Sequence, residues 1–177
     1  ISGGVGASDK LVVVGSPKGE VRAFGVDGKP LWESRVSSEV LAPPAVGDDV
    51  VLVRSSDSRI HALEPSDGKR KWIYQRATPS LALRSVAGPV ILDKAALVGF
   101  SGGKLLALSL ANGGPLWEAT VALPRGATEL ERIADVTSAP VLGPRQVCAA
   151  AYQGRLGCFD PASGNALWTR EISSIAG

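Results

Sequence analysis

The segments GEVRAFGVDGKPLW (residues 19–32), SRIHALEPSDGKRKW (58–72), GKLLALSLANGGPLW (103–117) and GRLGCFDPASGNALW (154–168) decide the fold. Each segment ends in a tryptophan that has a glycine four residues before it. The pairs are Gly28 with Trp32, Gly68 with Trp72, Gly113 with Trp117, and Gly164 with Trp168. Self-similarity at a period of about 40 to 50 residues is typical of propellers and solenoids. The chain is therefore expected to repeat one structural unit.

Each unit has the sequence pattern of four short strands. Small or aliphatic residues share one face of a strand because they recur at alternate positions: Val21 and Ala23, Ile60 and Ala62, Leu105 and Ala107, Leu156 and Cys158. An apolar run precedes each of these strands across a turn, which predicts a hairpin. A further turn at D-G, N-G or S-G leads into a strand at the tryptophan. A short stretch after Pro or Gly opens each unit and supplies the fourth strand.

Four antiparallel strands per unit, with no amphipathic helical pattern, predict an all-β propeller. The expected blades are residues 1–36, 37–76, 77–121 and 122–177, in one propeller fragment. The glycine and tryptophan pairs are expected to anchor the blades, since an indole buries about 150–250 Å². A ligand-stacking role for the tryptophans is disfavoured because, on a ring of blades, one ligand would not reach all of them.

Composition excludes several classes of protein. The chain has 177 residues, 45% of them hydrophobic, and a net charge of +2, which predicts a folded protein. Its basic residues are scattered, which argues against a nucleic-acid surface. No apolar run approaches the roughly 18 to 20 residues of a membrane span, and no signal-peptide pattern is present, so the chain as given is expected to be soluble. Because it starts at Ile1 within the repeat pattern, it is expected to be a fragment of a longer protein.

Candidate metal and catalytic residues are few. Cys148 and Cys158 are too few for a zinc site. A three-residue hairpin loop between them would set them opposite each other and permit a disulfide, whereas a two-residue loop would put them on opposite faces. Both outcomes stay open. The one histidine, His61, is expected to be structural, and no Ser/His/Asp or Cys/His constellation can be assembled. We therefore expect no metal, no cofactor and no catalytic residue.

Two connections between units are longer than the repeat requires. The distance from each tryptophan to the proline of the next unit is 12 residues, then 17, then 23. The added residues are 77–87 (ATPSLALRSVA), here called the first insertion, and 122–138 (ALPRGATELERIADVTS), the second insertion. Both run from the outermost strand of one blade to the innermost strand of the next. They are therefore expected to emerge side by side and to form one patch.

The patch has the composition of a protein-protein hot spot, in which apolar anchors and arginine are surrounded by charge. Its residues are Leu81, Leu83, Arg84, Arg125, Glu129, Glu131, Arg132 and Asp135. One alternative is that Leu81 and Leu83 begin an innermost strand and face the core. A second is that the run from Glu129 to Arg132 is a solvated helical turn, because Thr128 and Glu131 form the pattern of a capping box.

The repeat A-[FL]-x-x-x-x-G-x-x-x-W resembles that of propellers of the pyrroloquinoline-quinone (PQQ) type over essentially the whole chain. In addition, ISGGV (1–5), PSLALR (79–84) and GATELERIADVTSAPV (126–141) resemble the BamB family of lipoproteins, which serve the bacterial outer-membrane β-barrel assembly (BAM) machinery. The resemblance implies about four blades, half of an eight-bladed ring. It also implies a lipid-anchored, non-catalytic adaptor on the periplasmic face of the outer membrane, which binds the POTRA domains of BamA. Unfolded outer-membrane proteins are a further partner that it allows.

The resemblance also assigns residues. Leu81, Leu83, Arg84 and Asp135 match positions that contribute to BamA contact in the family, and Arg125, Glu129 and Arg132 complete the predicted partner-binding set. Thr137 stands where a second acidic residue is common, so charge complementarity depends more on Asp135. The alternative is a fragment of a quinoprotein dehydrogenase. Such enzymes resemble one another in a vicinal cysteine pair and acidic calcium ligands, neither of which this chain displays.

Overall fold

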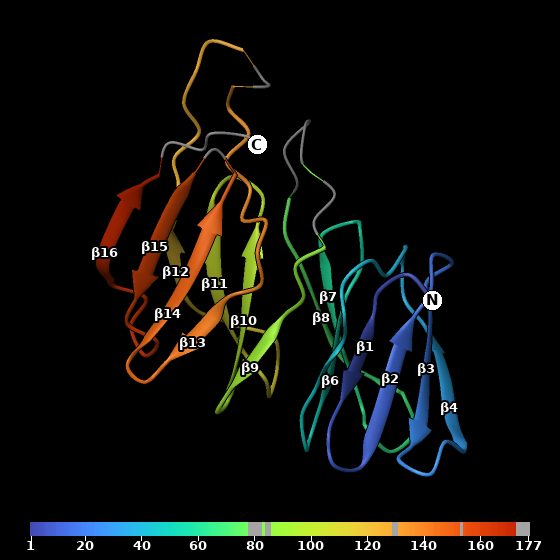
Figure 1. Ribbon diagram of the computed structural model, residues 1–177. Coiled ribbons are helices and arrows are strands. Elements are labelled where there is room, and N and C mark those ends of the chain that lie inside the picture. Colours follow the sequence, from blue (N-terminus) through green and yellow to red (C-terminus); the bar gives the residue numbers. More distant parts are fainter. Residues whose placement is uncertain (78–82, 84–85, 129–130, 153, 173–177) are drawn as a thin grey trace.

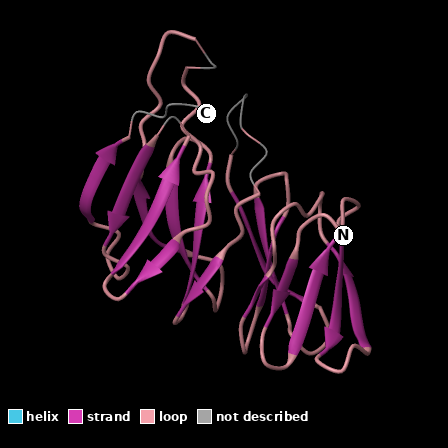
Figure 2. Cartoon of the chain, viewed as in Figure 1, coloured by secondary structure: helices cyan, strands magenta, loops and turns pink. Residues whose placement is uncertain are grey.

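The computed structural model describes residues 1–77, 83, 86–128, 131–152 and 154–172. These residues form four antiparallel sheets of four strands each, and Figure 2 shows only strands and loops among them. The first sheet contains β1 (Val5–Ala7), β2 (Leu11–Gly15), β3 (Glu20–Gly25) and β4 (Pro30–Arg35). The second contains β5 (Ala45–Val46), β6 (Val51–Arg54), β7 (Arg59–Leu63) and β8 (Arg70–Gln75). The third contains β9 (Val90–Leu92), β10 (Ala95–Phe100), β11 (Lys104–Ser109) and β12 (Pro115–Thr120). The fourth contains β13 (Val141–Gly143), β14 (Gln146–Ala151), β15 (Arg155–Phe159) and β16 (Ala166–Glu171).

Each sheet follows the chain in simple up-and-down order, so that every strand pairs with the next one in sequence. The sheets succeed one another from β1–β4 to β13–β16 (Figure 1), and the innermost strand β5 contacts both β1 and β9. This arrangement is a partial β-propeller of four blades, as the repeats predicted. We call the three boundaries between consecutive sheets the first, second and third seams.

The core lies in these seams. In β6, Val51 and Val53 pack toward the first sheet, whereas Leu52 between them packs toward the third sheet with Val98 and Leu108. Successive side chains of a strand point to opposite faces, so both faces of β6 are buried. This explains why β6 has consecutive apolar residues, whereas a strand with one exposed face would alternate apolar and polar residues. In β2, which has a neighbouring sheet on one face only, buried and half-buried residues do alternate.

The tryptophans cross the seams. Trp72 donates a hydrogen bond from Nε1 to the carbonyl oxygen of Leu110 at 2.8 Å. Its ring covers Gly113, where an added Cβ would lie 2.5 Å from ring atom Cε3. The same two contacts occur in the first seam (Trp32 with Pro65 at 2.7 Å and with Gly68) and in the third (Trp117 with Pro161 at 2.9 Å and with Gly164). The repeat therefore encodes a contact between the tryptophan of one sheet and the glycine turn of the next.

On the outer faces of the first and last sheets, this contact has no partner sheet among the described residues. The last sheet presents a tryptophan there, and the first sheet presents a glycine turn. The Trp168 residue is 41% exposed, compared with 8% for Trp72. At Gly28, an added Cβ would meet no described atom within 4 Å. These two residues give an internal reference for what the contact contributes in the seams.

The cysteines form a disulfide. Cys148 of β14 and Cys158 of β15 are direct partners in the strand register, and their Cα atoms are 4.0 Å apart. Ala151 pairs with Arg155, so three residues lie between the paired strand ends. Of the two outcomes left open by the sequence, the structure has the cross-strand disulfide.

Candidate partner-binding surface

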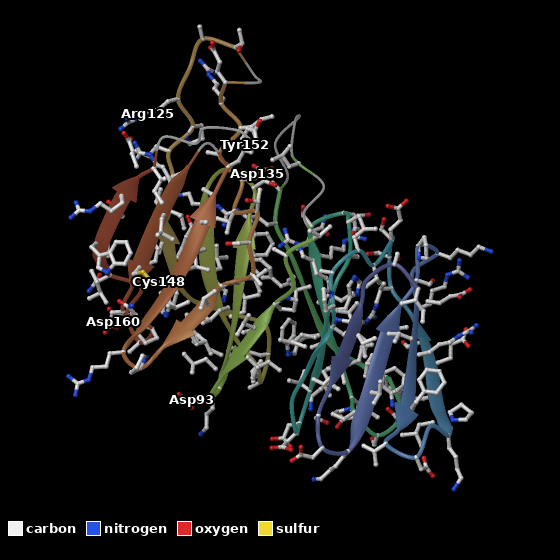
Figure 3. All side chains as sticks on the ribbon, in the orientation of Figure 1. Asp93, Arg125, Asp135, Cys148, Tyr152 and Asp160 are labelled. Carbon is white, nitrogen blue, oxygen red and sulfur yellow. A yellow bond between two sulfur atoms is a disulfide. The ribbon has the colours of Figure 1, made fainter. Side chains whose placement is uncertain are left out.

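The two insertions meet at one end of the propeller. The second insertion extends beyond the sheets, and Figure 3 shows Arg125, Asp135 and Tyr152 at that end, away from Asp93 and Asp160. In the first insertion, the backbone N–H of Leu83 donates to Oδ2 of Asp135 at 2.6 Å. Residues 52 positions apart in the chain are thus in direct contact. Leu81, Arg84 and Glu129 lie outside the described residues.

Leu83 does not belong to the innermost strand. It is half-buried, and β9 begins only at Val90. The alternative in which Leu83 begins that strand is therefore not the arrangement in the structure.

The second insertion contains an exposed hydrogen-bonded turn. The backbone N–H of Thr128 donates to the carboxylate of Glu131, and the N–H of Glu131 donates to Oγ1 of Thr128. The backbone N–H groups of Thr128 and Ala127 lower the pKa of Glu131. The capping pattern in the sequence is thus present, as one turn. Next to it, the exposed Arg132 donates from Nε to the carbonyl oxygen of Gly126 at 3.0 Å.

Beside this turn lies a hollow of about 410 Å³ with an apolar and arginine-rich lining. Leu123, Tyr152 and Ile172 line it and are 55%, 46% and 54% exposed. Arg125 also lines it, and its Nη1 is 3.7 Å from the carboxylate of Glu171. Sequence reasoning identified Arg125 but missed the three apolar residues, because they come from different loops that only the fold brings together.

Asp135 differs from the other predicted site residues because it is buried, with 3% of its surface exposed. Besides the bond from Leu83, it accepts one at 3.0 Å from the backbone N–H of Gly102, in the turn between β10 and β11. Arg54, at the end of β6, is also buried. Burial lowers the pKa of Arg54 to about 10, and the negative charge of Asp135 acts in the opposite direction. Arg54 was not among the site residues predicted from the sequence.

A polar cluster surrounds His61 in the first seam. Its Nε2 lies 3.1 Å from Oγ of Ser37 and 3.0 Å from Oγ of Ser55. The hydroxyl group of Ser55 donates a hydrogen bond to Oδ1 of Asp57. The carboxylate therefore binds a serine, and it does not orient the imidazole as the acid of a catalytic triad does. The structure thus brings together serines, a histidine and an aspartate that sequence reasoning could not assemble, in an arrangement that differs from that of a triad.

His61 gives a testable pH dependence. Burial lowers the pKa of His61 from 6.5 to about 4. Between these values the unfolded chain binds a proton more readily than the folded chain, so stability falls as the pH falls from 6.5 to 4. We expect the wild-type chain to lose about 3 kcal/mol more unfolding free energy than His61→Gln between pH 7 and pH 4. Urea unfolding of both proteins at each pH measures this difference. Parallel pH profiles would contradict the assignment.

The residues that the structure describes lack two features of other protein classes. No group of three or more histidine, cysteine, aspartate or glutamate side chains there is arranged to hold a metal ion. That part of the chain also contains no helix long and apolar enough to cross a bilayer.

Comparison with known proteins identifies the family. A family model described as outer membrane protein assembly factor BamB matches residues 1–177. The chain belongs to the BamB family. It is 49% identical to the BamB of Nitrosomonas eutropha and 47% identical to that of Bordetella pertussis, and both matches cover 100% of the chain. They cover 43% and 46% of those relatives, so the chain spans less than half of their length.

Solved structures agree on the fold. The crystal structure of BamB from Moraxella catarrhalis matches 98% of the chain and 54% of that protein, with a TM-score of 0.91 and 30% identity. A quinohemoprotein alcohol dehydrogenase from Comamonas testosteroni matches 97% of the chain with a TM-score of 0.78 and 14% identity. At that identity the second likeness shows a shared propeller fold and nothing about activity.

Proposed function

We propose that this chain is part of a non-catalytic adaptor of outer-membrane β-barrel assembly and that it binds the POTRA domains of BamA through its two insertions. The observation that carries the proposal is the hydrogen bond between Leu83 and Asp135, which joins the two overlong interblade connections. The names of the relatives support the assembly role. The full-length protein would act at the periplasmic face of the outer membrane, held by a lipid anchor.

The composition of this end of the propeller supports a protein partner. Leu123 and Tyr152 line the hollow described above together with the exposed Arg125. The second insertion also carries the exposed Arg132. Partly exposed aromatic and aliphatic anchors next to arginine are the features of interface hot spots. The same end carries the sequence stretches that are absent from the generic blade, so it is the part of the chain in which a partner-specific surface is expected.

The combined substitution Leu81→Ala, Leu83→Ala and Arg84→Ala tests the proposal. We expect it to raise the Kd for the BamA POTRA domains about a hundredfold or more, since hot-spot side chains each contribute about 1–2 kcal/mol or more. Isothermal titration calorimetry with the full-length protein measures this change. The matched control is Leu31→Ala with Leu116→Ala, which removes two exposed leucines from the outermost strands β4 and β12. Unchanged affinity in the triple variant, or a large loss of thermal stability, would contradict the proposal.

The non-catalytic part of the proposal has its own test. Adding PQQ and calcium to the full-length protein is expected to give neither tight binding nor dye-linked oxidation of alcohols. Either result would favour a quinoprotein dehydrogenase over the adaptor.

A further inference from the structure

Arg54 is a buried charged residue at a strand position where the other three sheets have glycine or alanine. In the strand register, Arg54 pairs with Ile60, and the equivalent pairs in the other sheets are Gly15 with Val21, Gly99 with Leu105, and Ala150 with Leu156. The small residues at two of these positions have a packing reason, because a Cβ at Gly15 or Gly99 would lie 2.3 Å from the side chain of Val40 or Val136. The second blade has an arginine instead, next to the first insertion.

Arg54 holds the end of the first insertion. Its Nη1 donates to the carbonyl oxygen of Ala87 at 3.2 Å and to that of Gly99 at 2.6 Å. Its guanidinium carbon lies 5.4 Å from the centre of the Phe100 ring. A buried arginine is costly unless its hydrogen bonds are satisfied and its charge is compensated. Two carbonyl oxygens, an aromatic face and the charge of Asp135 supply these conditions.

Asp135 holds the middle of the same insertion. Its Oδ2 accepts from the N–H of Leu83 and its Oδ1 accepts from the N–H of Gly102, so each carboxylate oxygen fixes a different segment. Bonds from backbone N–H groups to a carboxylate are charge-assisted and stronger than neutral ones. Because Asp135 lies in the second insertion, its side chain links that insertion to the first one and to the third blade.

We propose that Asp135 is a positioning residue. Together with Arg54 it holds the leucine-containing first insertion against the second insertion. Asp135 therefore affects partner binding through the first insertion and does not itself contact the partner. This inference rests on the proposed function for its partner and on the hydrogen-bond geometry for its mechanism. A contact residue needs an exposed head group, whereas the carboxylate of Asp135 is buried and both its oxygens accept backbone bonds.

Asp160 provides the control. It lies in the turn between β15 and β16, where its Oδ1 accepts from the backbone N–H groups of Ala162 at 3.0 Å and Ser163 at 2.8 Å. Figure 3 shows it at the other end of the sheets from Asp135. Asp160→Ala therefore removes another carboxylate that accepts backbone bonds, away from both insertions.

The first experiment needs no partner. Hydrogen exchange of the Leu83 and Gly102 amides is followed by NMR in the full-length protein, the Asp135→Ala and Asp135→Asn variants, and the Asp160→Ala control. We expect both amides to exchange about ten- to a hundredfold faster in Asp135→Ala, as the loss of charge-assisted bonds requires. The asparagine variant, which keeps one acceptor oxygen, is expected to be intermediate, and Asp160→Ala is expected to match the wild type at both amides. Unchanged exchange at Leu83 in Asp135→Ala would overturn the inference.

The second experiment separates positioning from contact. Asp135→Asn is combined with the triple variant at Leu81, Leu83 and Arg84, and the Kd for POTRA domains is measured for each member of the cycle. A positioning residue gives coupled effects: Asp135→Asn weakens binding about tenfold alone and adds nothing in the triple variant. Additive losses would overturn the inference and make Asp135 a direct contact. If the unmodified protein bound no POTRA domain, the proposed function would fail, and the exchange measurement would decide the role of Asp135.

Discussion

Replacing Trp72 by alanine is expected to lower the unfolding free energy of the 177-residue chain by about 3–5 kcal/mol, the usual cost of truncating a buried aromatic side chain. Trp72 is 8% exposed, packs in the second seam with Leu52 and Ile60, and donates to the carbonyl of Leu110. The substitution removes the apolar contact and leaves that carbonyl without its donor. Chemical denaturation at low micromolar concentration measures the loss.

Trp168→Ala is the control for this prediction. Trp168 occupies the same repeat position on the outer face of the last blade and is 41% exposed. We expect a loss of only about 1 kcal/mol, since less apolar surface leaves water at that site. Equal losses for the two variants would contradict the view that the seam contact, and not the tryptophan's own strand, provides the stabilisation.

Gly113→Ala is expected to cost about 3 kcal/mol, through two effects that add. Gly113 has a φ of +73°, a conformation that costs an L-residue about 1–2 kcal/mol. The new methyl group would also lie 2.5 Å from the Trp72 ring, which forces the indole out of its place.

Gly28→Ala separates these two effects. Gly28 has nearly the same backbone conformation, with a φ of +79°, but an added Cβ meets no described atom within 4 Å. We therefore expect only the conformational cost, about 1 kcal/mol. Thermal and urea unfolding of both variants measure the difference. A Gly28 variant as unstable as the Gly113 variant would show that backbone strain alone explains the glycines.

The fold was predictable because each blade repeats the same local signals. Period-two strands, glycine turns and one tryptophan at a fixed place led to four-stranded sheets, and the structure has them. The sequence pattern did not reveal what the glycine contributes. Only the structure shows that Gly113 belongs to the turn on which the tryptophan of the preceding blade packs.

The candidate site was only partly predictable. The overlong connections stood out by their length, but burial did not follow from composition: Asp135 belongs to a charged loop and is nonetheless enclosed. Arg54 was missed because it ends an apolar strand, VVLVR, where arginine is usually a solvated strand end. Its significance follows from comparing blades in register, which requires the pairing of strands and not the sequence alone.

Site-specific photocrosslinking tests whether the two insertions contact BamA. A photoreactive amino acid is placed at position 83 or 125 of the full-length protein in cells, and at positions 31 and 116 on the outermost strands as controls. The proposed interface predicts BamA adducts from positions 83 and 125 and none from the controls. Adducts from the outermost strands, with none from position 83 while BamA still co-purifies, would contradict it.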